Sequence, residues 1–239
     1  MSLNPLAQVK DYHSMLNRIA WLTTVSATVA VWRLRLNWQW FNGLFAALDS
    51  LDFELSVADA KVAIKILGYL IPGVVIALCA RAVRLHDRLS DLLRIRESFD
   101  VEEIIVPMAR GAGFPVGTLS VEGLKEARSK LMGPIFYRYA SSTDPKIDKH
   151  LIYEALDWWS WYWALVESIA ILGTTALILA ILGGYSETAM LAIGCVVMLV
   201  VLPFFRRHCA RYAAREVDEI LADDARKGAV LKEFRALSS

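Results

Sequence analysis

DPKIDKHLIYEALDWWSWYWALVESIAILGTTALILAILGG, residues Asp144–Gly184, is the stretch from which the rest of this chain can be interpreted. Asp144 and Pro145 predict the start of a helix, because Asp accepts a hydrogen bond at the N-cap and Pro loses no N–H bond at the first helical position. We expect no break before Gly183, so the helix should rise roughly 55 Å at about 1.5 Å per residue. The stretch therefore predicts one long, continuous helix.

The composition of this helix changes along its length. Ile147–Asp157 is charged, whereas the residues that lead up to Leu182 are almost purely apolar. A cluster of aromatic residues separates the two parts. Its members are Trp158, Trp159, Trp161, Tyr162 and Trp163. Because such rings concentrate at the membrane–water interface, we expect the helix to begin in water, pass the interface at this cluster and then cross a bilayer.

Overall composition agrees with a membrane protein that also has soluble parts. The chain is 56% hydrophobic and 21% charged, so the two kinds of residue must be segregated along it. A formal net charge of +1 argues against a dedicated nucleic-acid binder. Neither the cysteines nor the histidines have metal-ligand spacing, and no G-x-S-x-G, H-E-x-x-H or Walker motif is present. We therefore expect neither enzymatic activity nor a cofactor.

Four apolar segments predict four membrane spans. They cover residues of about 17–36, 60–80, 160–182 and 188–205. The loop 49–59 is acidic, whereas arginines follow the second span from Arg81 and the fourth span from Arg206. By the positive-inside rule, the acidic loop lies outside and both termini are cytoplasmic. We therefore expect an all-α polytopic protein of the inner (plasma) membrane.

This pattern divides the chain into four parts. They are an N-terminal membrane hairpin (1–80), a helical cytoplasmic domain (81–157), a C-terminal membrane hairpin (158–205) and a cytoplasmic helical tail (206–239). The capping-box pattern Ser56–Asp59 predicts that the second-span helix begins near Val57. No breaker appears between Val74 and Ser98, so this helix, like the third-span helix, should continue into the cytoplasmic domain. Asn37–Leu48 is either an interfacial helix or the frayed end of the first span.

A polar seam is predicted in the third span. Ser160, Glu167 and Thr174 repeat every seven residues and so share one helix face. An ionised carboxylate in the apolar layer is costly, so Glu167 should face a water-filled cavity, a cation or a neighbouring subunit. The structural alternative is a hydrogen bond between helices.

A basic stripe is predicted in the second span. Pro72 lies between basic residues on both sides at roughly helical spacing. The charged members are Lys61, Lys65, Arg81, Arg84 and Arg88. One interpretation is a pore-lining helix with basic rings at both mouths. In the other, the lysines snorkel, the arginines follow the positive-inside rule, and the proline kinks the helix.

The cytoplasmic domain contains one possible ligand-binding loop. A short helix from Asp100 should end at two glycines, and a further helix should run to about Met132. Backbone N–H groups at the second helix could hold the phosphate of a small anionic ligand. The residues concerned are Arg110, Gly111, Gly113, Thr118, Ser120 and Arg128. The alternative is an ordinary C-cap followed by a loop.

Two functions from different classes are compatible with this architecture. The first is a homo-oligomeric ion channel, pore or membrane-disrupting effector gated by its cytoplasmic sensor domain. Effectors of bacterial antiviral defence offer an architectural analogy for it. The second is a non-conducting scaffold that docks a cytoplasmic protein, or an accessory subunit of a transporter or membrane enzyme. The expected partners are the lipid bilayer and further copies of the chain, with a cytoplasmic protein or a small anionic ligand as a further partner.

Overall fold

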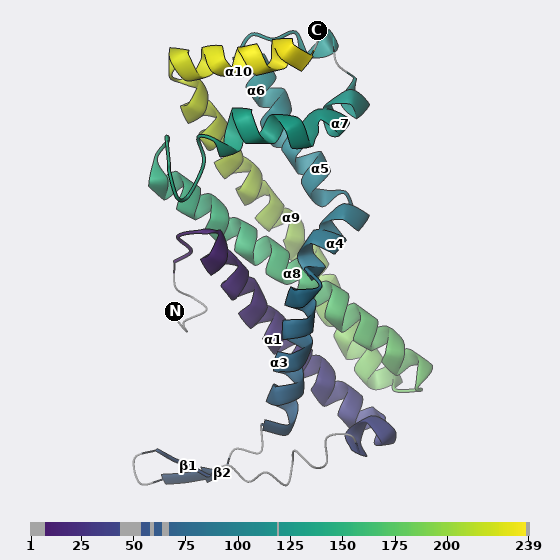
Figure 1. Ribbon diagram of the computed structural model, residues 1–239. Helices are drawn as coiled ribbons and strands as arrows, with labels where there is room; N and C mark the ends of the chain where they lie inside the picture. The colour runs from purple at the N-terminus through teal and green to yellow at the C-terminus, as the bar shows by residue number, and fades with distance from the viewer. Residues whose placement is uncertain (1–7, 44–53, 58–59, 64–66, 119, 238–239) are drawn as a thin grey trace. The chain divides into compact units, whose positions relative to one another are not determined.

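The computed structural model describes residues 8–43, 54–57, 60–63, 67–118 and 120–237 (Figure 1). Apart from one short hairpin, the elements of these segments are helical, so the all-helical class is confirmed. The α-helices are α1 (Tyr12–Asn37), α3 (Leu67–Ala82), α4 (Leu85–Leu92), α5 (Ile95–Phe99), α6 (Val106–Gly111), α7 (Val121–Met132), α8 (Lys149–Ile181), α9 (Tyr185–Leu221) and α10 (Asp224–Leu237). Two π-helical turns, Asp100–Ile105 and Gly133–Tyr137, and a 3-10 turn, Val116–Thr118, connect the shorter helices.

The segment expected to open the second span is a β-hairpin. Strand β1 (Glu54–Val57) pairs antiparallel with β2 (Ala60–Ala63), with Leu55 opposite Val62. Polar and apolar residues alternate through Glu54–Val57, which is the period of a strand. The expectation that a helix begins near Val57 is therefore wrong. Lys61 lies on β2, and Lys65 lies outside the described residues.

The absence of Gly and Pro between Val74 and Ser98 predicts one continuous helix. The structure instead shows three shorter helices there. Arg84 (φ 50°) separates α3 from α4, and Arg94 (φ 51°) separates α4 from α5. Such left-handed residues are uncommon when they are not glycine, so the sequence contains no signal for them. The second break is supported locally, because Ser90 Oγ accepts a hydrogen bond from Arg96 N (3.3 Å). That bond satisfies a backbone N–H of the first turn of α5.

The long helix α8 begins later than expected. Asp148, and not Asp144, is its N-cap, because Asp148 Oδ1 accepts a hydrogen bond from His150 N (2.9 Å). The predicted end near Leu182 is confirmed, since α8 stops at Ile181 and Gly183 has a φ of 82°. Helix α9 then continues through Pro203 to Leu221, so the fourth apolar segment and the start of the tail are one helix.

The chain divides into two compact units. Unit 1 comprises residues 1–16, 86–162 and 203–239, and unit 2 comprises 17–85 and 163–202. Helices α8 and α9 each contribute residues to both units. The core of unit 1 comes from three distant parts of the sequence, and α10 contacts α6 and α7 within it (Figure 1). Its largest fully buried side chains are Val9, Phe99, Ile105, Met108, Leu124, Ile135, Ile220, Val230 and Phe234.

In unit 2, α1 and α8 run in the same direction. Thr23 of α1 donates a hydrogen bond to Glu167 of α8, and Leu34 further along α1 packs with Leu179 further along α8. Contacts that advance together along both helices require a parallel pair. The same cluster of buried residues includes Ala176 and Leu191.

Helices α3 and α9 run in the opposite direction. Along α3, Gly73 lies against Thr28, whereas the later Arg81 hydrogen-bonds to the earlier Asn17 of α1 (3.0 Å). Along α9, Thr188 Oγ1 lies 3.3 Å from the Ala176 carbonyl oxygen, and Cys195 lies beside the earlier Ile169 of α8. In chain order, the helices of unit 2 therefore alternate in direction.

Two of the described helices, α8 and α9, are long and apolar enough to cross a membrane. The apolar part of α3, Leu70–Ala82, is shorter than this. In the apolar window of α9 only 11% of the residues are buried, against 39% in α8. Large exposed side chains cover α9, among them Ile193, Val196, Val197, Leu199 and Val200. Since water solvates such a surface poorly, these helices indicate association with a membrane.

Candidate functional site

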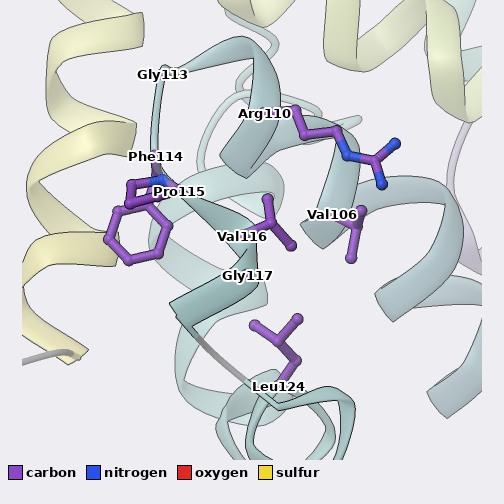
Figure 2. Close-up of a pocket in the computed structure, with 8 residues that line it drawn as sticks. All are labelled: Val106, Arg110, Gly113, Phe114, Pro115, Val116, Gly117 and Leu124. Carbon is purple, nitrogen blue, oxygen red and sulfur yellow. The ribbon is translucent and has the colours of Figure 1, made fainter.

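A pocket with a volume of about 770 Å³ lies in unit 1, where α6, the following loop and α7 meet. Its lining is mainly apolar and contains one charged side chain. The lining residues are Val106, Arg110, Gly113, Phe114, Pro115, Val116, Gly117 and Leu124 (Figure 2). Its volume falls in the range of small-molecule sites, and the pocket is wide open to solvent.

The turn after α6 explains how the chain builds one side of this pocket. Gly113 adopts a φ of 81°, which residues with a side chain rarely adopt. Phe114 N donates to Ala109 O (2.9 Å) and Gly113 N donates to Arg110 O (3.0 Å), which is the Schellman pattern. Phe114 is buried and stacks on Phe234, with ring centroids 5.5 Å apart. The predicted glycine C-cap is confirmed, and it places the loop 114–117 beside α6.

The other residues of the predicted phosphate site do not line this pocket. Ser120 Oγ is the N-cap of α7 and accepts a hydrogen bond from Gly123 N (3.0 Å). Arg128 is held by Asp100, with a distance of 2.7 Å between Arg128 Nη2 and Asp100 Oδ2. Gly111 lies against the Leu221 side chain of α9. The side chain of Thr118 lies outside the described residues, so only Arg110 and Gly113 of the predicted set are placed at the pocket.

Arg110 is the charged residue of the lining. It lies in the last turn of α6 and is exposed. In the described part of the chain its guanidinium has neither a hydrogen-bond partner nor an ion-pair partner. Figure 2 shows this side chain beside Val106, with Val116 and Leu124 on the other sides of the same space. An uncompensated cation therefore borders an apolar surface.

The buried polar groups of unit 2 pair with one another. Glu167 is 4% exposed, and its Oε2 accepts a hydrogen bond from Thr23 Oγ1 (2.5 Å). One residue further along α8, Ser168 Oγ lies 2.7 Å from Ser26 Oγ. The structure thus places Glu167 against a neighbouring helix, as in the structural alternative considered from the sequence. The sequence reasoning missed Thr23 and Ser26, although polar residues spaced three apart in an apolar segment were a usable signal.

The predicted seven-residue seam does not continue along α8. Thr174 is exposed, whereas the next residue, Thr175, is 4% exposed and donates to the Ile171 carbonyl oxygen (2.8 Å). A straight helix drifts by only about 20° per seven residues, so the three side chains still point in roughly the same direction. Thr174 is exposed because no described segment covers that face of α8 there. Ser160 is fully buried in unit 1 and donates to the Asp157 carbonyl oxygen (2.6 Å).

The predicted basic stripe is not a single helix face. Pro72 is buried within α3, Lys61 lies on β2, and Arg84 falls in the break between helices. Arg81 is exposed and hydrogen-bonds to Asn17, and Arg88 is exposed on α4. These residues therefore belong to four different local structures.

The aromatic cluster of α8 packs partly inside the protein. Trp158 stacks on His208 with ring centroids 4.1 Å apart, and Trp159 meets Phe99 edge-on at 4.6 Å. Tyr162 and Trp163 are buried, and Trp161 is half-buried. The aromatic cluster was predictable from the sequence, whereas its contacts with His208 and Phe99 were not.

A protein-family model matches residues 11–233, and so runs from the residue before α1 to near the end of α10. The chain belongs to the YmfE protein family. Comparison with curated proteins and with solved structures gave no match. Family membership therefore covers both units but adds no ligand or reaction.

Unit 1 contains two buried acids, Asp100 and Glu216. Burial raises the pKa of Asp100, and the Arg128 guanidinium partly offsets that effect. Burial also raises the pKa of Glu216 to about 8, with a further contribution from Glu219 on the same helix. Glu216 is 5% exposed. In the part of the chain that the structure describes, no group of three or more His, Cys, Asp or Glu residues could hold a metal ion.

Proposed function

We propose that this protein is a four-span membrane scaffold, with both termini on the cytoplasmic side of the inner membrane, that presents unit 1 to a cytoplasmic partner. The main support for the proposal is that unit 2 buries its polar side chains between helices and exposes apolar ones. Glu167 and Ser168 of α8 are buried against α1, whereas α9 turns its apolar side chains outward. Lipid solvates an apolar exterior, and paired polar groups need no water-filled path.

The antiparallel order of unit 2 supports four spans. Helix α1 packs alongside α8 from Thr23 to Leu34. A bilayer crossed by α8 would therefore also surround that part of α1. Gly73 packs α3 against α1 in the same unit. With directions that alternate in chain order, four crossings return both ends of the chain to one side. The arginines after α3 and within α9 make that side the cytoplasmic one by the positive-inside rule.

The homo-oligomeric pore is the second candidate, and one observation favours it. Only 11% of the apolar window of α9 is buried, which leaves a helix face that another copy of the chain could cover. In that case unit 1 would act as the gate, and a role as an antiviral effector would follow the analogy drawn from the sequence. The scaffold is the better-supported candidate because Glu167 pairs with Thr23 instead of facing outward.

One experiment separates the two functions. The purified protein is reconstituted in planar bilayers for current recording, and its oligomer mass is measured in the same detergent. We expect resistance to carbonate extraction from membranes and no discrete conductance. Discrete channel currents from a homo-oligomer would overturn the scaffold and establish the pore.

The Thr23–Glu167 hydrogen bond supplies a prediction for this proposal. We expect Glu167→Leu to lower stability by about 1–3 kcal/mol, because it leaves the Thr23 hydroxyl without its acceptor. Glu167→Gln retains an acceptor and should have a smaller effect. In a Thr23→Val background, Glu167→Leu should cost measurably less, since the partner is already removed. Thermal unfolding in detergent measures all four variants, and strictly additive effects would show that the two side chains are not coupled.

A further inference from the structure

We infer that the pocket of unit 1 binds an amphiphile with an apolar chain and a single carboxylate, such as a medium-chain fatty acid, and that Arg110 pairs with the carboxylate. The inference goes beyond the proposed scaffold, because it gives unit 1 a small-molecule ligand whether or not a protein partner also docks there.

The lining determines the apolar part of the ligand. Val106, Val116 and Leu124 surround the space in Figure 2, and Phe114 and Pro115 lie along the loop side. Leu124 is 2% exposed and Phe114 7%, so these walls are anchored in the core of unit 1. Removing an apolar chain from water against such walls is favourable by about 25 cal/mol per Å².

Arg110 determines the head group. A guanidinium binds a carboxylate through two parallel N–H···O bonds, and such charge-assisted bonds are stronger than neutral ones. In the described part of the chain, Arg110 has no acidic partner to compete with a ligand. Among the acids at the start of this helix segment, Glu103 is the nearest along the chain, and it forms no ion pair with Arg110 in the described residues. Glu102 pairs with Arg206 (3.0 Å) and Asp100 with Arg128.

The alternative head group, a phosphate, fits the structure less well. A phosphate needs several donors, and the predicted donors are engaged elsewhere. Ser120 caps α7, and Arg128 is held by Asp100. With one cation in its lining, the pocket matches a single negative charge. A nucleotide would also place polar groups against Val106 and Val116, which offer no hydrogen bonds.

The test is photo-crosslinking of the full-length protein in nanodiscs. The probe is decanoic acid that carries a diazirine on its chain, and the adducts are mapped by mass spectrometry. We expect adducts on residues 106–124 that unlabelled decanoate prevents. The matched probe is decanol with the same diazirine, which keeps the apolar chain but has no charge. It should label these residues about tenfold less, the loss expected for a charge-assisted hydrogen bond.

Variants test the residue itself. Arg110→Gln should reduce labelling by the acid probe about tenfold and leave labelling by the decanol probe unchanged. Arg211→Gln, which changes another exposed arginine of unit 1, should reduce neither. If Arg110→Gln fails to fold, the comparison of the two probes on the wild-type protein still decides the question.

Several outcomes would overturn the inference. Equal labelling by the acid and the alcohol would remove the role of Arg110. Adducts on α8 and α9 without adducts at 106–124 would show partition into the bilayer only. A third probe, decyl phosphate with the same diazirine, tests the alternative head group, and preferential labelling by it would assign the site to a phosphate. Carbonate extraction tests membrane insertion separately, so failure of membrane insertion and failure of ligand binding are distinguishable.

Discussion

Replacing Gly73 with alanine is expected to destabilise the protein by about 1–3 kcal/mol, the usual cost of forcing extra volume into a packed contact. Gly73 is buried within α3. A Cβ atom there would lie 2.9 Å from the Thr28 backbone nitrogen and 3.0 Å from its Cα. Because these are backbone atoms of α1, a change of rotamer cannot relieve the clash, and α1 and α3 must separate. The thermal unfolding midpoint of the purified protein in detergent measures the effect.

Gly194→Ala is the matched control for this prediction. Gly194 lies within α9, and a Cβ added there would meet nothing within 4 Å. Alanine is the better helix former by about 1 kcal/mol, so this variant should be as stable as the wild type or more stable. If both alanine variants unfold at the same temperature, the contact of α3 with α1 is not part of the folded protein.

The second large effect concerns the pH dependence that Glu216 confers. Burial raises the pKa of this carboxyl to about 8, against 4.5 for an unburied glutamate. Between these two values the unfolded chain has lost a proton that the folded protein retains. Stability therefore falls as the pH rises from about 4.5 to about 8 and changes little above that. The total loss amounts to several kcal/mol at most.

Glu216→Gln removes the ionisable group and keeps its shape. We expect this variant to match the wild type near the low end of that window and to be clearly more stable at its upper end. Denaturant unfolding of both proteins across the window, followed by circular dichroism, checks the prediction. Glu126→Gln, on the exposed face of α7, should show the same pH dependence as the wild type. A gap between Glu216→Gln and the wild type that does not grow with pH would contradict a neutral Glu216.

The long apolar helices and the pocket differ in how far the sequence could predict them. The apolar segments from Ala164 to Leu182 and from Ala189 to Phe205 were recognisable, because length and composition alone mark a helix that can cross a membrane. The glycine C-cap at Gly113 was also predictable, since few other residues adopt a positive φ without strain. The pocket beside it was not, because Val106 and Leu124 are ordinary core residues until the fold brings them together.

Local signals misled where two structures satisfy the same pattern. Ser56–Asp59 matches a capping box, but Ser56 and Val57 belong to β1 and pair with Lys61 and Ala60 of β2. Asp144–Pro145 matches a helix start, but Asp148 supplies the N-cap that forms. The breaks at Arg84 and Arg94 had no local signal, because an arginine adopts a left-handed conformation only where surrounding packing holds it there.

By itself the sequence determined the helical class, the apolar segments and the place where charge gives way to aromatic residues, because each depends on neighbours a few positions apart. Only the tertiary structure decided that Glu167 accepts a hydrogen bond from Thr23 and that Glu216 is buried. It also decided that Arg128 forms an ion pair with Asp100, whereas Arg110 forms none with a described residue. These outcomes depend on which distant segments meet. The free energy of a charged or polar side chain is set by its partner and its burial, and neither can be read from local spacing.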